Sequence, residues 1–348
     1  MQAGQLLKDA LTRIASRENL SPDVANSLFR TVMEAGFDEG QLGALLGALL
    51  AKGESVDELV GAARAMRSSA IAIRCDDPNV IDTCGTGGDG ISTFNVSTCA
   101  GIIAAAAGAT VAKHGNRSTT RVSGSTEVLS ELGVDIEADA PTVERCLREA
   151  RIGYLNARLL HPAMKVVAPI RQAIPVRTIF NLLGPLTNPA SVRRQLVGVP
   201  RPELTEKMAA ALSQLGAVHA WVVHGHNGLC DVSITGPTII CEVRDGETRA
   251  FRVGPADAGL ARGELKDLLV DSPGRSADAV RAILGGEIGA RRNHALMNAG
   301  AALVVAGLSA NLADGVIMGA QAIDSGAASA TLEEWRTLSQ GDRSARTS

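Results

Sequence analysis

The sequence has few aromatic residues and no excess of one charge. Its 348 residues include two tryptophans, one tyrosine and five phenylalanines, too few rings for the stacking platforms on which single-stranded nucleic acids bind. The 34 Lys and Arg residues nearly balance the 37 Asp and Glu residues, which gives a net charge of −3. The composition therefore does not support bulk attraction to nucleic acid or to an anionic membrane.

Long apolar runs and paired cysteines are also missing. The apolar segment 101–112 is too short and too rich in glycine to span a bilayer. The N-terminal segment lacks the apolar stretch of a signal peptide, and the six cysteines include no Cys-x-x-Cys pair. We expect a protein of the reducing cytoplasm that does not enter a membrane. Its length allows two to three domains of about 150 residues each.

The first part of the chain is predicted to be helical, and the next part to alternate strands and helices. In residues 1–70, Ser21 precedes a proline and Ser55 precedes Glu58 as in a capping box, both typical of helix starts. Strands are predicted at 79–83 and 109–112, and helices at 98–107 and 127–132. This alternation predicts an α/β fold with a mostly parallel sheet whose strand ends bind ligands.

Five prolines interrupt residues 160–195, so we expect a segment that crosses between two domains without a long helix. Residues 219–225 are predicted to begin a second sheet-forming region. A β-hairpin follows, with strands at 238–243 and 248–253 around Asp245-Gly246. Residues 276–336 are predicted to be helical.

The strongest local signal is the glycine-rich loop Gly85–Gly90, which directly follows a predicted strand. Closely spaced glycines let backbone N–H groups approach a phosphate. Ser97 and Thr98 lie where the next helix begins, and a helix N-terminus favours an anion. The loop matches neither GxxxxGK[ST] nor GxGxxG, and a plain glycine turn with a Ser/Thr cap is the alternative interpretation.

A second polar loop, Lys113–Ser125, carries cations and hydroxyl groups immediately after the next predicted strand. Lysine supplies a mobile charge and arginine a fixed fork, a mixture suited to a substrate with more than one phosphate. Two such loops at neighbouring strand ends would bind a polyanion; a solvated connection is the alternative.

Three motifs in this order resemble the anthranilate phosphoribosyltransferase family. They are GTGGDG with TFNVST (93–98), KHGNRS (113–118) with SGS (123–125), and PIRQAIPVRTIFNLLGPLTNP (169–189). The resemblance extends over essentially the whole chain. It implies a small helical domain, residues 1–72 plus about 165–192, beside a large α/β domain, residues 73–164 plus 193–340, with a mostly parallel central sheet, a helical C-terminal portion and a polar tail at 341–348.

The resemblance also implies a homodimer, with 5-phosphoribosyl 1-diphosphate (PRPP), anthranilate and Mg²⁺ as its small-molecule substrates and cofactor. The residues implied for PRPP are Gly85, Gly88, Asp89, Thr93, Asn95, Val96, Ser97 and Thr98 from the first loop, and Lys113, His114, Gly115, Asn116, Arg117, Ser118, Thr119, Thr120, Arg121 and Ser125 from the second. For anthranilate they are Gly85, Asn116 and Arg171.

The residues themselves also favour Arg171 as the partner of a carboxylate. A carboxylate needs a planar bidentate partner, and this arginine lies in an apolar, proline-rich segment. An ordinary interdomain salt bridge is the alternative interpretation. The implied reaction is displacement at the anomeric carbon by the anthranilate amine, so no nucleophilic side chain is required. The Lys113 ammonium, Mg²⁺ and backbone donors would stabilise the leaving diphosphate. His114 is interpreted as a residue that shapes the loop, not as a general base.

One position departs from the family pattern. The family usually carries an Asp-Glu pair that holds two magnesium ions, whereas this sequence has Cys230-Asp231. A thiol is a poor ligand for hard Mg²⁺, so we expect Asp231 and Ser97 to be the metal ligands and the second metal site to be weakened. Cys230 is otherwise interpreted as a small buried residue. His219, His224 and His226 do not have the spacing of a zinc site.

Two other functions remain open. A pyrimidine nucleoside phosphorylase shares the expected architecture and also acts at a ribosyl anomeric carbon. Its substrate carries no 5′-phosphate or diphosphate, which would leave the second cationic loop without a role. A family member that has lost catalysis and binds nucleic acid or a protein partner is the other alternative, which the altered acidic pair keeps open.

Overall fold

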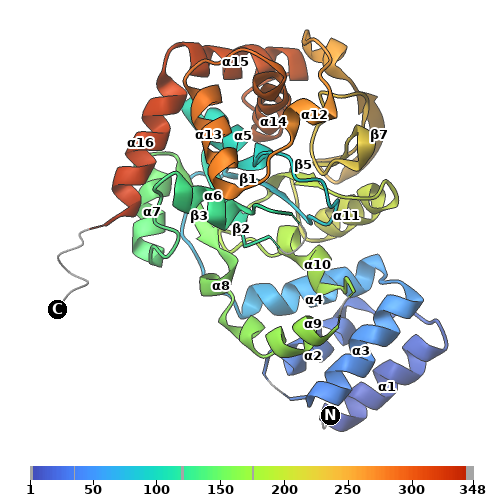
Figure 1. The fold of residues 1–348 in the computed structure, drawn as a ribbon. Helices are drawn as coiled ribbons and strands as arrows, with labels where there is room; N and C mark the ends of the chain where they lie inside the picture. Colours follow the sequence, from blue (N-terminus) through green and yellow to red (C-terminus); the bar gives the residue numbers. More distant parts are fainter. Residues whose placement is uncertain (1–2, 35, 119–120, 175, 342–348) are drawn as a thin grey trace.

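The computed structural model describes residues 3–34, 36–118, 121–174 and 176–341. Figure 1 shows a group of helices from the N-terminal part of the chain below a larger α/β body. The predicted residues Thr119 and Thr120, and the tail beyond Gly341, lie outside the described residues.

Four consecutive helices form the N-terminal part, as the sequence predicts: α1 (Ala3–Ala15), α2 (Pro22–Met33), α3 (Glu39–Lys52) and α4 (Val56–Ser68). The Ser21 side chain caps α2, and Ser55 forms a capping box with Glu58 at the start of α4. Glu58 is fully buried and also accepts hydrogen bonds from Leu20 N and Lys52 Nζ, both at 3.0 Å. The Glu58 carboxylate thus holds together the chain before α2, the end of α3 and the start of α4.

The proline-rich segment forms only short helices, in agreement with the prediction. They are α8 (Ala157–Leu160), η1 (Pro162–Lys165), α9 (Ala168–Ala173), α10 (Phe180–Leu183) and η2 (Gly184–Leu186). α9 packs on α3 and α10 packs on α4, so this segment returns to the N-terminal helices in the middle of the chain. The exact domain boundaries given above stay a prediction.

The seven strands found in the described residues belong to one sheet, and the predicted sheet-forming region that begins at residue 219 adds its strands to that sheet. The strands are β1 (Ile81–Gly85), β2 (Val111–Gly115), β3 (Ile152–Asn156), β4 (Arg194–Gly198), β5 (His219–His224), β6 (Thr238–Arg244) and β7 (Glu247–Val253), in the spatial order β3-β2-β1-β4-β5-β6-β7. The first five are parallel, and β5, β6 and β7 are antiparallel. The predicted hairpin is present, and because β6 pairs with β5 it extends the existing sheet.

Helices cover the sheet and form the C-terminal part. They are α5 (Val96–Ala106), α6 (Ser125–Glu131), α7 (Ala140–Glu149), α11 (Glu203–Gln214), α12 (Leu265–Leu268), α13 (Pro273–Leu284), α14 (Ala290–Ala306), α15 (Leu312–Asp324) and α16 (Ala327–Ser339), with short turns η3 (His226–Gly228) and η4 (Pro255–Ala258). None of the helices in these described ranges has the length and apolar character needed to cross a membrane.

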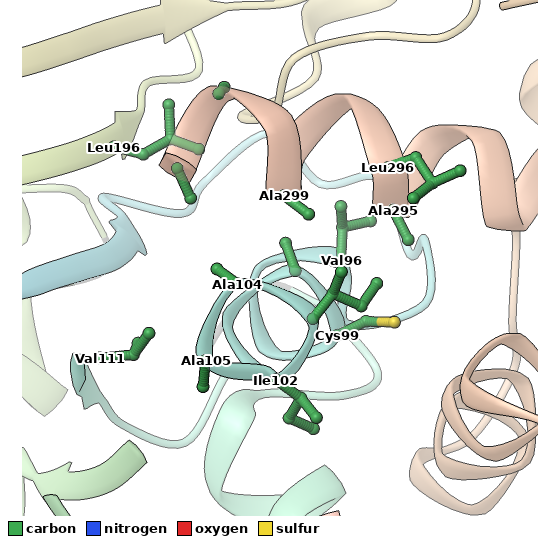
Figure 2. Packing of buried hydrophobic residues seen from close by; sticks show 14 of the residues in the cluster. Val96, Cys99, Ile102, Ala104, Ala105, Val111, Leu196, Ala295, Leu296 and Ala299 are labelled. Atoms are coloured by element: carbon green, nitrogen blue, oxygen red, sulfur yellow. The ribbon is translucent and has the colours of Figure 1, made fainter. Parts of the chain in front are cut away.

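The largest core is built around α5 and α14, and it relies on small side chains because the sequence has few rings. Figure 2 shows Ala295 and Ala299 of α14 on the side that faces α5, close to Val96. These residues are at most 2% exposed. The close packing of α5 against α14 and the sheet fixes the position of the α5 N-terminus, which borders the glycine-rich loop.

Candidate active site

The carboxyl ends of β1 and β4 lie side by side at the point where the strand order reverses, which is where open α/β sheets bind ligands. Gly85 and Gly198 pair there, and a Cβ on Gly85 would lie 3.0 Å from the Gly198 carbonyl oxygen. A Cβ on Gly198 would lie 1.7 Å from the Cys230 carbonyl oxygen. Three backbone segments therefore meet at this edge with no room for side chains between them.

The glycine-rich loop after β1 turns through left-handed backbone conformations at Gly87, Gly88 and Gly90. The Arg177 guanidinium lies directly against this loop: its Nη2 donates to the Thr86 carbonyl oxygen at 3.1 Å. A Cβ on Gly88 would lie 1.5 Å from Arg177 Nη1. The absence of a side chain at position 88 thus lets a cation from the proline-rich segment approach the loop.

Helix α5 begins at Val96, close to the predicted start, and places Ser97 in its first turn. The Val96 side chain is 2% exposed and belongs to the core, so the predicted role of Val96 in binding PRPP can concern only its backbone. Thr93 and Thr98 are also buried, and their hydroxyl groups have no hydrogen-bond partner among the described residues.

Lys113 lies behind the loops and not in the space between them. Its side chain is almost completely buried, and Nζ donates to the Thr83 carbonyl oxygen at 2.7 Å and to Ser97 Oγ at 3.1 Å. Burial lowers the pKa of Lys113, whereas the carboxylates of Asp82 and Asp231 raise it. The ammonium therefore borders the site through the Ser97 hydroxyl.

Asn95 ties the first loop to the second. Its Oδ1 accepts hydrogen bonds from Ser123 Oγ at 2.7 Å and from Ser276 Oγ of α13 at 2.8 Å. In this structure the Asn95 carbonyl is thus engaged with protein hydroxyls, and the residue fixes the distance between the two loops.

The second loop is partly exposed, and β2 extends into it as far as Gly115. A Cβ on Gly115 would lie 2.2 Å from Ser125 Oγ, so glycine is required there by the close approach of α6. Asn116 and Arg117 are exposed, Asn116 Oδ1 accepts from Arg117 N, and Ser118 Oγ accepts from Arg121 N at 2.8 Å. The loop therefore folds back on itself and places Arg121 over the glycine-rich loop.

Arg121, Asp89, Cys230 and Asp231 form a cluster that joins three loops. Arg121 Nε donates to Asp89 Oδ1 at 2.7 Å, and Arg121 Nη2 contacts Asp89 Oδ2. The Cys230 N–H donates to the same Oδ2 at 3.2 Å. Burial raises the pKa of the Cys230 thiol well above its usual value, as does Asp89, so the thiol stays neutral. Burial also raises the pKa of Asp231, to about 6, which leaves its carboxylate largely ionised at neutral pH.

This cluster fits one magnesium ion. Asp231 Oδ2 is buried and has no hydrogen-bond partner among the described residues, and a lone buried carboxylate oxygen is suited to a hard cation. The Cys230 thiol is neutral and offers no oxygen. Within the described ranges no three His, Cys, Asp or Glu side chains converge on a metal position. The Ser97 hydroxyl lines the same small cavity as Asp231, so these two residues offer protein oxygens to the ion, and Mg²⁺ habitually takes its other ligands from phosphates and water.

His114 faces away from this cluster. Its Nδ1 lies 3.0 Å from the Gly184 carbonyl oxygen and its Nε2 lies 3.2 Å from Nε2 of His161. Burial lowers the pKa of His114 to about 3 and that of His161 to about 4. Both rings are therefore neutral near pH 7, which agrees with the interpretation of His114 as a residue that shapes the loop.

Arg171 makes no ion pair among the described residues, which removes the interdomain salt bridge as an explanation. Its guanidinium lies over the Phe180 ring at 5.7 Å from the centroid and is half-buried. No described hydrogen bond joins Arg171 to Gly85 or Asn116. Direct contacts thus join some of the residues predicted to bind PRPP, Asp89 with Arg121 and Lys113 with Ser97, whereas no described hydrogen bond joins the three residues predicted to bind anthranilate.

The three histidines near β5 each have a different partner. His219 Nε2 lies 2.9 Å from Glu242 Oε1, His224 Nδ1 lies 3.0 Å from the Val199 carbonyl oxygen, and His226 Nδ1 lies 3.2 Å from Thr235 Oγ1. Their ring nitrogens are thus used in separate structural contacts.

Two further residues belong to the site and are not predicted by the sequence patterns. Arg177 contacts the glycine-rich loop, as described above. Asn298 of α14 holds the loop after Asp231, because its Oδ1 accepts from Val232 N at 2.8 Å and its Nδ2 donates to the Val232 carbonyl oxygen at 2.9 Å. Asn298 lies in an alanine-rich helix with no local feature that indicates this role.

Comparison with known proteins covers nearly the whole chain. The model of the glycosyl transferase family a/b domain matches residues 77–329, and that of the family's helical bundle domain matches residues 8–70. The anthranilate phosphoribosyltransferase of Roseiflexus sp. (strain RS-1) is 48% identical over 337 residues, which cover 96% of this chain and 98% of the relative.

Solved structures give the same result. The anthranilate phosphoribosyltransferase of Thermus thermophilus superposes with a TM-score of 0.91 at 38% identity, covering 96% of this chain and 100% of that one. The Saccharomyces cerevisiae enzyme, in complex with PRPP and Mg, has a TM-score of 0.88 at 26% identity, with 96% and 98% covered. A further structure of the yeast protein is a complex with 4-fluoroanthranilate.

Proposed function

The chain belongs to the glycosyl transferase family that includes the anthranilate phosphoribosyltransferases, and we propose that it transfers the phosphoribosyl group of PRPP to the amine of anthranilate. The products are N-(5-phosphoribosyl)anthranilate and diphosphate, in tryptophan biosynthesis. The observation that carries this function is the identity of 48% over 96% of the chain. The two polar loops at the reversal point of the sheet supply the polyanion site that PRPP requires.

PRPP binds between the two loops. Backbone N–H groups of the glycine-rich loop and the first turn of α5 receive phosphate oxygens. Gly87 and Gly90 leave the loop open to the ligand, because nothing lies within 4 Å of a Cβ at either position. The exposed Asn116 and Arg117 and the partly buried Ser118 and Ser125 enclose the substrate from the other side. Lys113 acts through Ser97, where its charge stabilises the departing diphosphate.

Mg²⁺ is the cofactor, and Asp231 and Ser97 would hold it. When bound, the ion supplies positive charge to the diphosphate oxygens as the anomeric bond breaks. No covalent intermediate on the protein is required, so the contribution of the chain is to position the substrates and to balance charge.

Anthranilate binds through Arg171. Its guanidinium is half-buried, stacks on Phe180 and has no ion-pair partner among the described residues, so its planar fork is available to a carboxylate. The exposed Asn116 and the backbone of Gly85 lie at the PRPP side of the acceptor.

Loss of anthranilate fluorescence, measured with PRPP and Mg²⁺, tests this function. We expect Arg171→Ala to reduce kcat/KM for anthranilate by about a hundredfold, since truncating one partner of a buried, hydrogen-bonded charge pair costs about 2–5 kcal/mol. The matched control is Arg148→Ala, an exposed arginine of α7 that pairs with Glu149, which should keep wild-type kinetics. A folded protein that leaves anthranilate unchanged, or that cleaves thymidine or uridine with phosphate, would contradict the proposal.

The proposed assembly is a homodimer formed through the N-terminal helices, and the proposed setting is the cytoplasm. Helix α3 supports the dimer because it is apolar on its outer side as well: Leu42, Leu45 and Leu46 face the core, while Ala44, Gly47 and Leu50 are exposed. A helix that is apolar all round is normally buried. The six cysteines are all unpaired, as a reducing compartment would keep them.

A further inference from the structure

The Asp89 carboxylate uses its whole acceptor capacity on protein groups. A carboxylate offers about four lone-pair positions. Oδ1 accepts from Arg121 Nε at 2.7 Å and from Ile91 N at 3.4 Å, while Oδ2 accepts from Arg121 Nη2 and from Cys230 N at 3.2 Å. The side chain is completely buried. Asp89 therefore has no free oxygen position for a divalent ion.

In contrast to Asp89, Arg121 keeps most of its hydrogen-bonding capacity, because most of its N–H donors have no acceptor among the described residues. A guanidinium carries five N–H donors in a fixed fork, and the two that face Asp89 are bonded to it. The remaining donors have no acceptor among the described residues. The side chain is only 17% exposed, so the fork is held in one orientation beside the glycine-rich loop. These donors are available to an anionic ligand that enters between the loops.

Asp231 is the carboxylate of the cluster that forms no ion pair among the described residues, although the charges of Arg121 and Lys113 act on it. The charges of Arg121 and Asp89 cancel, and Cys230 is neutral, which leaves the single negative charge of Asp231 with a buried Oδ2 that has no partner among the described residues. One carboxylate attracts one divalent ion, and the neighbouring arginine discourages a second ion by repulsion.

We propose that Arg121 is the second cation of this site: one Mg²⁺ ion binds at Asp231, and the Arg121 guanidinium, fixed by Asp89, binds diphosphate oxygens directly. This inference rests on the proposed function, because it takes PRPP as the ligand. In this proposal Arg121 is a substrate-binding residue that supplies the positive charge of a second metal ion, and Asp89 is the residue that positions it.

Counting bound Mn²⁺ by electron paramagnetic resonance, in the presence of PRPP, tests the proposal without any turnover. We expect one protein-bound Mn²⁺ per protomer in the wild type. Arg121→Ala frees one acceptor position on each oxygen of Asp89 and removes the charge of Arg121, so this variant should bind two. Asp89→Asn in the Arg121→Ala background should return the number to one.

Arg148→Ala removes an exposed charge of α7 that lies outside the proposed binding site, and should leave the ion count at one. Two ions in the wild type would overturn the proposal, as would one ion in a folded Arg121→Ala variant or none in the wild type. The number of ions bound to the wild type tests the proposal even if the Arg121→Ala variant does not fold. Failure of the proposed function is distinguishable, because it appears as unchanged anthranilate fluorescence while the ion counts still follow the expected pattern.

Discussion

The missing side chain of Gly88 makes room for the Arg177 guanidinium, and this pair can be tested at the scale of single residues. Gly88 has a φ of 90° and Gly87 a φ of 60°, so alanine at either position should cost about 1–2 kcal/mol of stability. Only Gly88→Ala also displaces Arg177, since nothing lies within 4 Å of a Cβ on Gly87.

We therefore expect Gly88→Ala to raise KM for PRPP by about tenfold or more, the size of a lost charge-assisted hydrogen bond. Gly87→Ala should leave KM within about threefold of the wild type, because it does not displace Arg177 and no such hydrogen bond is lost. Steady-state kinetics at saturating anthranilate, together with thermal unfolding of both variants, measure the two effects separately. Equal KM values in the two variants would show that Arg177 has no part in binding.

Which site residues could be predicted from the sequence depends on whether their role is local. Gly85, Asp89 and Lys113 stand in short motifs next to predicted strands, and the structure places them at one edge of the sheet. Arg177 bonds to a residue 91 positions away and Asn298 to one 66 positions away. Such contacts depend on how the chain returns to the sheet, which a local pattern does not encode. The burial of Val96 and Lys113 has the same origin.

At the scale of elements, the proposed homodimer can be tested at helix α3. Gly47 is exposed on α3, and a Cβ there would meet nothing within 4 Å of the same chain. Gly47→Glu should therefore fold normally, because glutamate is a better helix former than glycine by up to about 1 kcal/mol. In a dimer formed through α3 it would place a charge in the interface.

We expect the wild type to have a mass near twice 35.9 kDa in light scattering, and Gly47→Glu to have the mass of one chain. The matched control is Gly274→Glu on α13, where a Cβ also meets nothing within 4 Å; this variant should stay dimeric. A Gly47→Glu protein that keeps the mass of the wild type would exclude α3 from the interface.

Helix starts and turns were predictable because side chains close to them specify the backbone. Ser21, Ser55 and Asp245-Gly246 are examples in which a cap or a turn is present at the predicted position. Strands β3 and β4 were not predicted, since five-residue segments such as Arg194–Gly198 become strands only through their neighbours in the sheet. Strand β1 begins two residues later than predicted for the same reason.

At the scale of the whole molecule, the sheet and the proline-rich segment are joined through two histidines. The Gly184 carbonyl can only accept, so His114 Nδ1 is the donor to it, and His114 Nε2 accepts from Nε2–H of His161. Local patterns did not predict this link, because it depends on contact between distant segments.

This link makes the stability of the molecule dependent on pH. The pKa of His161 falls from 6.5 to about 4 on folding, chiefly through burial. Below pH 6.5 the unfolded chain therefore takes up a proton that the native protein does not. The free energy of unfolding should consequently fall as the pH is lowered toward 4, by up to about 1.4 kcal/mol per pH unit for each such histidine. Asp82 and Asp231, whose pKa values burial raises, act in the opposite direction.

Replacing His161 separates its share from these opposing groups. In His161→Gln the unfolded chain has one fewer proton to gain, so the slope of unfolding free energy against pH should be smaller by about 1.4 kcal/mol per pH unit between pH 6.5 and 4. Urea unfolding followed by tryptophan fluorescence measures it, since Trp221 and Trp335 both lie in the core that contains the sheet. Identical slopes for the wild type and the variant would mean that His161 titrates at its ordinary pKa in the folded protein and that acid does not act on this link through His161.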